Sequence, residues 1–354
     1  MNSNDKRPIF NDEDRASISA AANKTLVYLD SNVWIDIAER FHNVAQRCLN
    51  AVQTEKVLFP VSFSSVTEVI EQPTATKRAH VATLMDDLSK GLCFRSSKEL
   101  HEMEANLALP IILGASEIAI ERQEILTWIV EFAARITVQF PPSWKQADAD
   151  KFTRLLAERP ELRSVKWLVD HSPPNQMRLE YAESMGRYVE QMTTAIARSK
   201  SHYQHLAKDI RREQLLLEER LHVVKQLISP KMSKNLLRIT GPEKLLDTIA
   251  AVLKQVGEGS KKRLEEIMKA MPSLDLQCHI MAERACNHSR KAREQDFFDV
   301  EHAIAGGAYA DFFITSDGDL FDLLTNRCSV SADQNCRVVR GVKGLEDVLD
   351  TIHS

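Results

Sequence analysis

Carboxylates stand at or beside the points where predicted strands end. Asp30 is the last residue of the apolar segment TLVYLD, and Asp317 comes directly after FFITS. Glu68 lies in the helical segment that follows KVLFPVS, and Asp299 lies near the start of the helical segment that precedes DFFITSD. Ligands of an open parallel sheet bind beyond the carboxyl ends of its strands, so these four acids are expected to converge on one crevice.

Clustered carboxylates favour a bound cation. They repel one another and raise each other's pKa unless positive charge neutralises them. No histidine or cysteine stands at the expected ligand positions, so the oxygen donors favour Mg²⁺ or Mn²⁺ over zinc. Such an ion lowers the pKa of a bound water and stabilises charge on a phosphate oxygen, which is the chemistry of phosphodiester hydrolysis. The four acids therefore predict a metal-dependent nuclease site.

Strand and helix signals alternate around these acids at both ends of the chain. The first part contains short apolar runs at 25–30, 56–62 and 92–96, with helical segments between them. In the last part, FFDVEHAIAGGAYA and GDLFDLLTNR predict helices on either side of the DFFITSD strand, and CRVVR precedes a closing helix. This alternation predicts an α/β fold with a parallel sheet.

The middle of the chain has a different pattern. It is rich in Leu, Glu, Lys, Arg and Ala at helical spacing and lacks the alternation. We therefore predict a flexible tail at 1–23, one discontinuous α/β domain made of 24–106 and 290–354, and an all-helical insertion at 107–289. The two α/β parts together have roughly 150 residues, the common size of a single domain.

The composition is that of a soluble protein, with 44% hydrophobic and 27% charged residues. No signal-peptide core is recognisable, and no segment has the roughly eighteen apolar residues of a membrane span. Together with six cysteines that contain no CxxC pair, this predicts a cytoplasmic protein with no membrane partner. The net charge of −4 argues against coating nucleic acid by bulk charge, but it is compatible with a local basic track.

The α/β segments resemble the PIN-domain nucleases. LVYLDSNVWIDIA is similar to the opening strand, acid and helix of that family, and SFSSVTEVIE is similar to its second segment, whose helical Glu matches Glu68. DVEHAIAGGAYADFFITSDGDL resembles the third segment, with Asp299 opening a helix and Asp317 after the strand. The resemblance covers none of the helical middle. It implies a three-layer α/β/α fold and a metal-dependent endonuclease, usually acting on RNA, with Asp30, Glu68, Asp299 and Asp317 as catalytic and metal-site acids.

The same resemblance points to auxiliary residues. Asn32 and Ser316 match positions where the family often places a small polar group near the metal. Asp296 and Asp319 lie close to the expected acids Asp299 and Asp317. A shift of one helical turn would exchange Asp296 for Asp299, so Asp296 and Asp319 are also candidate metal ligands. Basic residues just before the third segment are candidate phosphate contacts: Arg284, Arg290, Lys291 and Arg293.

These observations predict an endonuclease that uses Mg²⁺ or Mn²⁺ and prefers single-stranded RNA to DNA. Toxins and phage-defence effectors are among the biological roles open to such an enzyme. The alternative is a non-catalytic PIN-like module that binds RNA or protein, and the helical insertion could carry a homo-oligomer interface or a regulatory partner. A phosphate-accepting receiver or hydrolase would explain Asp30 but gives no role to Glu68 and Asp299. Each acid taken singly could also be a helix cap or a solvated residue.

Overall fold

The computed structural model describes the chain in several stretches: residues 12–112, 120–129, 163–172, 176–198, 209–210, 264–287, 291–328 and 336–353. The chain divides into two compact units. The first contains Met1–Ser96, Glu121–Glu190 and Arg293–Ser354, and the second contains Ser97–Ile120 and Gln191–Ala292. All of the candidate metal-site acids belong to the first unit.

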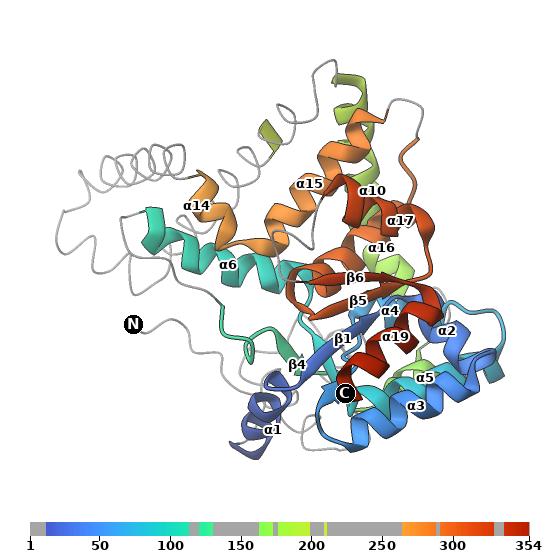
Figure 1. The fold of residues 1–354 in the computed structure, drawn as a ribbon. Helices are drawn as coiled ribbons and strands as arrows, with labels where there is room; N and C mark the ends of the chain where they lie inside the picture. The colour runs from blue at the N-terminus through green and yellow to red at the C-terminus, as the bar shows by residue number, and fades with distance from the viewer. Residues whose placement is uncertain are drawn as a thin grey trace, which may run out of the picture. The chain divides into compact units, whose positions relative to one another are not determined.

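The first unit contains a four-stranded parallel sheet, as the sequence predicted (Figure 1). β1 (Thr25–Leu29) lies between β2 (Val57–Leu58) and β5 (Phe312–Thr315), and β6 (Arg337–Arg340) pairs with β5. The N-terminal and C-terminal parts of the chain therefore pair directly within one sheet. The strand order reverses at β1, so the carboxyl end of β1 is the switch point at which open parallel sheets bind ligands.

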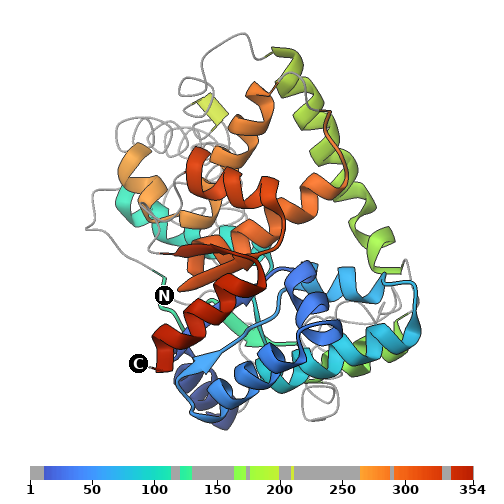
Figure 2. The same ribbon diagram turned by 45° about the vertical axis from the view of Figure 1, so that its right-hand side comes forward.

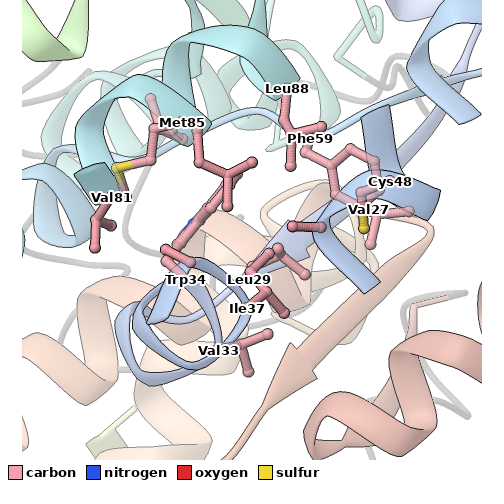
Figure 3. Packing of buried hydrophobic residues seen from close by; sticks show 14 of the residues in the cluster. Val27, Leu29, Val33, Trp34, Ile37, Cys48, Phe59, Val81, Met85 and Leu88 are labelled. Atoms are coloured by element: carbon pink, nitrogen blue, oxygen red, sulfur yellow. The ribbon is translucent and has the colours of Figure 1, made fainter. Parts of the chain in front are cut away.

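One face of the sheet packs against helices from both ends of the chain. In the described part of the chain, this face is covered by α2 (Ser31–Glu39), α3 (His42–Gln53) and α19 (Gly341–His353). Val27 and Leu29 of β1 share their hydrophobic cluster with Trp34 and Ile37 of α2 (Figure 3). In Figure 2 the red helix α19 lies beside the blue helices α2 and α3. Burial of such large side chains stabilises the fold by roughly 1.5–3 kcal/mol each, so this core fixes the orientation of β1.

The opposite face of β1 carries Tyr28, which is fully buried. It packs against the helical segment made of α16 (Gln295–His302) and its π-helical continuation η2 (Ala303–Gly307). Its ring also meets Phe313 of β5 edge-on, with 5.3 Å between the ring centroids. Side chains alternate between the two faces of a strand, so Tyr28 points away from the Val27 and Leu29 cluster.

The predicted strands at 56–62 and 92–96 are shorter than expected. β2 ends at Leu58, two residues before Pro60, which has no amide hydrogen to donate to a sheet. Beyond this interruption Val61 forms a parallel bridge with Cys93 of β3 (Leu92–Phe94). β3 itself pairs antiparallel with β4 (Leu126–Trp128), a strand inside the segment that was predicted to be entirely helical.

The described part of the first unit contains further helices. They are α1 (Asp12–Ala22), α4 (Phe63–Ile70), α5 (Ala75–Ser89), α9 (Val165–His171), α17 (Gly318–Asp322) with its π-helical continuation η3 (Leu323–Arg327), and the first part of α10 (Gln176–Arg198). α1 lies within the segment predicted as a flexible tail. It is held by an ion pair in which Arg163 Nη1 lies 2.7 Å from Asp14 Oδ1.

The described part of the second unit is helical. α6 (Ser97–Ile112), α14 (Leu264–Lys269) and α15 (Pro272–Cys286) contact one another. The buried Glu104 carboxylate accepts hydrogen bonds from the amides of Ser273 and Leu274, at 2.8 and 3.2 Å, and so caps the start of α15. Much of the predicted insertion lies outside the described residues. Among the helices that are described, none has the length and apolar character needed to cross a membrane.

Gly306 permits the close approach of η2 to Tyr28. A Cβ atom at this position would lie 2.3 Å from Tyr28 Cδ1. We expect Gly306→Ala to lower the free energy of unfolding by about 1–3 kcal/mol, because the buried ring cannot move without disturbing its neighbours. Urea unfolding measures this change.

The matched control is Gly186→Ala, because a Cβ atom at Gly186 in α10 would meet nothing within 4 Å. This change should be neutral or stabilising by up to about 1 kcal/mol, since alanine favours the helix. Equal unfolding midpoints for the two variants would contradict the tight packing of Tyr28 on η2.

Candidate metal centre

Asp30 joins the end of β1 to the start of α2. It is the N-cap of α2, and its Oδ1 accepts a hydrogen bond of 2.9 Å from the amide of Val33. Its Oδ2 accepts hydrogen bonds from the Thr315 hydroxyl and, at 3.1 Å, from the Ser316 amide, both at the end of β5. Only 3% of Asp30 is exposed. These donors fix the carboxylate at the switch point and tie the two ends of the chain together there.

Burial raises the pKa of the Asp30 carboxyl above its ordinary value. The hydrogen bonds from Thr315 and Val33 and the positive charge of His302 act in the opposite direction, and the negative charge of Glu68 raises the pKa further. Asp30 and Glu68 therefore influence each other electrostatically, as the predicted acidic cluster requires.

Glu68 is held by three side chains. Its Oε2 accepts hydrogen bonds from Ser31 Oγ at 2.5 Å and from His302 Nε2 at 2.6 Å, and its Oε1 accepts one from Gln295 Nε2 at 2.8 Å. Burial alone would raise the pKa of Glu68. The charge of His302 and these three hydrogen bonds outweigh burial, so the pKa is lowered. Glu68 is therefore an ionised carboxylate pinned to α2 and α16.

His302 is the functional candidate that the sequence reasoning missed. It is 3% exposed, at the end of α16, and it lies on the same helix face as Asp299 because the two are three residues apart. Burial lowers its pKa, but Glu68 foremost and also Asp30 and Asp299 raise it, and the net change is an increase. His302 thus stands among three of the four predicted acids.

A chain of hydrogen bonds continues from His302 into the core. The Tyr28 hydroxyl lies 2.5 Å from His302 Nδ1 and 2.6 Å from Ser62 Oγ. With His302 protonated, Nε2 donates to Glu68, Nδ1 donates to the Tyr28 oxygen, and the Tyr28 hydroxyl donates to Ser62. Ser62 also begins α4 through a capping box with Ser65. The position of Glu68 is therefore coupled to the packing of β1 and to the start of its own helix.

This cluster does not have the geometry of a serine-hydrolase triad. In such a triad the serine and the acid lie on different nitrogens of the histidine. Here Glu68 Oε2 and Ser31 Oγ both lie near His302 Nε2, at 2.6 and 3.4 Å, while Nδ1 faces Tyr28. Ser31 donates directly to Glu68, so Ser31 orients the carboxylate.

Asp317 lies at the same edge of the sheet. It is the N-cap of α17, and its Oδ1 accepts hydrogen bonds from the amides of Asp319 and Leu320, at 2.7 and 2.9 Å. The preceding residue, Ser316, donates its amide to Asp30 although the two are 286 positions apart in sequence. Among the described residues, Asp317 Oδ2 has no hydrogen-bond donor, so one carboxylate oxygen remains available at this edge.

The geometry favours Asp299 over Asp296 as the candidate metal ligand on α16. Asp296 is 2% exposed, and its Oδ2 accepts a hydrogen bond of 3.1 Å from the Arg293 amide at the start of α16. Asp299 is only partly buried, and its charge helps to raise the pKa of His302. Asp296 therefore has a local capping role, while Asp299 acts on the cluster.

The remaining candidates have varied positions. Asn32 is exposed in the first turn of α2, and Ser316 contacts Asp30 through its amide rather than its hydroxyl. Asp319 is exposed, with Arg327 Nη2 at 3.4 Å from its Oδ1. Neither Asn32 nor Asp319 therefore has a contact that ties it to the Asp30 carboxylate in the described part of the chain.

The residues of the predicted basic track differ in their exposure. Arg284, at 3% exposure, is buried within α15 and is not presented to solvent. Lys291 and Arg293 are exposed. Arg290 lies outside the described residues. We therefore retain Arg293, in the same unit as the acids, as the stronger of these candidates for contact with a phosphate.

The type of donor in this cluster suits a hard divalent cation. Asp30 and Glu68 each accept three hydrogen bonds, fewer than the roughly four that a carboxylate can accept. The carboxylates of Asp299, on α16, and Asp317, at the start of α17, could supply further oxygen ligands. Within the described stretches, no three or more His, Cys, Asp or Glu side chains are close enough in this geometry to hold one ion. Sharing an ion therefore requires side-chain movement; Asp317 and Asp299 are only partly buried, whereas Asp30 is buried.

Comparison with known proteins does not assign this arrangement to a family. The chain matches no protein-family model, and it has no significant match among curated proteins or solved structures.

Proposed function

We propose that this protein is a PIN-like endonuclease that uses Mg²⁺ or Mn²⁺ to hydrolyse phosphodiester bonds in single-stranded RNA. The observation that carries the proposal is the placement of Asp30 at the switch point of a parallel sheet, pinned there by the end of β5. Glu68 and Asp299 act on the same histidine, and Asp317 follows the residue that binds Asp30. A three-layer fold and a cytoplasmic location form part of this proposal.

The proposed metal site consists of Asp30, Glu68, Asp299 and Asp317. When bound there, a divalent cation would lower the pKa of a water molecule and stabilise negative charge on the phosphate. Asp30 is already fixed by three donors, so it can serve as the rigid ligand. Asp317, the N-cap of α17, and Asp299 of α16 are only partly buried, and they would supply the remaining oxygen ligands.

The role of His302 in this scheme is to position Glu68. His302 and Ser31 both donate hydrogen bonds to Glu68 Oε2, and Gln295 donates one to Oε1. Partners of this kind fix the orientation of a metal-binding carboxylate, and their loss typically costs about 10- to 100-fold in metal affinity or activity. His302 does not need to touch the substrate in order to affect the reaction.

A non-catalytic binding module is the second candidate. The observation that favours it is that both carboxylate oxygens of Asp30 and both of Glu68 already accept hydrogen bonds from amides and side chains. In that case the acidic network would stabilise the sheet edge, and RNA or a partner protein would bind without being cleaved.

Cleavage assays separate the two candidates. Labelled single-stranded RNA, single-stranded DNA and double-stranded DNA are incubated with the full chain in Mn²⁺, in Mg²⁺ or in EDTA. We expect cleavage of single-stranded RNA in either metal and none in EDTA. Retention of RNA on the protein without cleavage in any metal would favour the binding module, and cleavage that persists in EDTA would overturn the metal-dependent mechanism.

A further inference from the structure

Arg340 occupies a position at the candidate metal centre that neither the acids nor the predicted basic track explains. It is the last residue of β6, and it pairs in register with Thr315 of β5. The Thr315 hydroxyl donates to Asp30. The backbone of Arg340 is therefore one strand away from a residue that contacts the central acid, at the carboxyl edge of the sheet.

The side chain of Arg340 lies over the start of α17. A Cβ atom on Gly318 would lie 3.0 Å from Arg340 Nη2 and 3.6 Å from Cζ, so the guanidinium rests against the backbone of this glycine. Gly318 is the residue between Asp317 and Asp319. The absence of a side chain at Gly318 thus leaves room for a positive charge beside Asp317.

Arg340 is an exposed residue, and no described residue forms an ion pair or a hydrogen bond with its side chain. The neighbouring acids have other donors, because Asp317 Oδ1 accepts two amides and Asp319 is paired with Arg327. An arginine that ends a strand without an acidic partner is available to an external anion. Its planar guanidinium can donate two parallel hydrogen bonds to one phosphate group.

We propose that Arg340 binds a backbone phosphate of single-stranded nucleic acid and thereby positions the nucleic-acid strand across the metal centre. The inference rests on the proposed nuclease function and adds a substrate contact to it. A phosphate held beside Gly318 would place the adjoining phosphodiester next to Asp317. Arg340 is a positioning residue in this scheme, since the acids remain responsible for the reaction.

Arg337 provides a matched control within the same strand. It is exposed like Arg340, but it pairs with Phe312 at the opposite end of β6. Three residues of extended strand separate the two positions by about 10 Å. Arg337→Ala therefore removes the same charge from the same strand without touching the carboxyl edge.

The test measures binding of a labelled single-stranded RNA oligonucleotide in EDTA at several salt concentrations, with the full chain. We expect Arg340→Ala to weaken binding about 5- to 20-fold and to reduce the slope of log affinity against log salt by about 0.7, the contribution of one phosphate contact. Arg340→Lys should keep the slope and restore part of the affinity, because lysine retains the charge but not the paired donors. Arg337→Ala should match the wild type.

Cleavage in Mn²⁺ gives a second readout. Arg340→Ala should raise KM while kcat stays within about threefold, because a phosphate contact made equally in the ground and transition states affects binding alone. If the wild type binds and cleaves RNA while Arg340→Ala behaves like Arg337→Ala in both assays, the inference about Arg340 is wrong and the nuclease proposal stands. If the wild type neither binds nor cleaves nucleic acid, both are overturned.

Discussion

Asp317→Asn is expected to reduce metal-dependent RNA cleavage by at least about 100-fold while leaving the fold intact. Asparagine is as good an N-cap as aspartate, so its side-chain oxygen can still accept from the amides of Asp319 and Leu320. Only the negative charge is lost. Changes to residues that merely orient a metal ligand cost about 10- to 100-fold, so loss of a ligand should cost at least as much. Initial cleavage rates in Mn²⁺ measure the effect.

The control for this substitution is Asp350→Asn. Asp350 is on α19, 71% exposed at its side chain, and pairs with Arg47. Exposed pairs of this kind contribute little to stability, and Asp350 is nine residues along α19 from the carboxyl edge, or about 13 Å. Asp350→Asn should cleave RNA like the wild type. Equal activity of the Asp317 and Asp350 variants would remove Asp317 from the site.

His302→Ala is expected to have the largest effect on stability. It leaves Glu68 without its charged partner and Tyr28 without one of its two hydrogen-bond partners, in a region that is almost completely buried. Removal of one member of a buried ion pair costs about 3–5 kcal/mol. Urea unfolding should show this loss. Cleavage, measured where the variant is still folded, should fall about 10- to 100-fold because Glu68 is no longer oriented.

Two further variants separate the charge pair from general packing. Tyr28→Phe removes only the hydroxyl from the same network, so it should cost about 1 kcal/mol. A double-mutant cycle between His302→Ala and Glu68→Gln should give a coupling free energy above about 1 kcal/mol. Additive effects of the two substitutions would show that the contact between Glu68 and His302 does not contribute to stability.

The sheet and its acidic edge were predictable because both follow from local signals. β1 and β5 are short apolar runs, as expected for strands buried in a parallel sheet, and the apolar pair Val338 and Val339 marks β6 between two exposed arginines. Asp30 and Asp317 could be selected because they end or follow such runs. β2 was overestimated because Pro60 interrupts the sheet in the middle of an apolar segment. β4 was missed because three residues carry too little pattern to distinguish a strand from a helix, and its partner β3 is remote in sequence.

The rest of the candidate site depends on contacts between distant segments. His302 lies 234 residues from Glu68, so the sequence around either residue does not predict that the two side chains pair. Its spacing from Asp299 was the one available signal, since residues three apart share a helix face. Arg340 was missed for a different reason. The predicted phosphate contacts were basic residues close in sequence to the third acidic segment, whereas the register of β5 and β6 brings a different arginine to the carboxyl edge.

Binding of Mn²⁺ tests the central claim most directly, because the claim is that acids from both ends of the chain hold the same ion. Titration calorimetry on the wild type, Asp30→Asn, Asp317→Asn and Asp350→Asn should be done below their unfolding transitions. We predict one class of Mn²⁺ site in the wild type and in Asp350→Asn. Its affinity should fall at least about tenfold in both Asp30→Asn and Asp317→Asn. Unchanged Mn²⁺ affinity in either of these two variants, or no binding by the wild type, would contradict the shared metal centre.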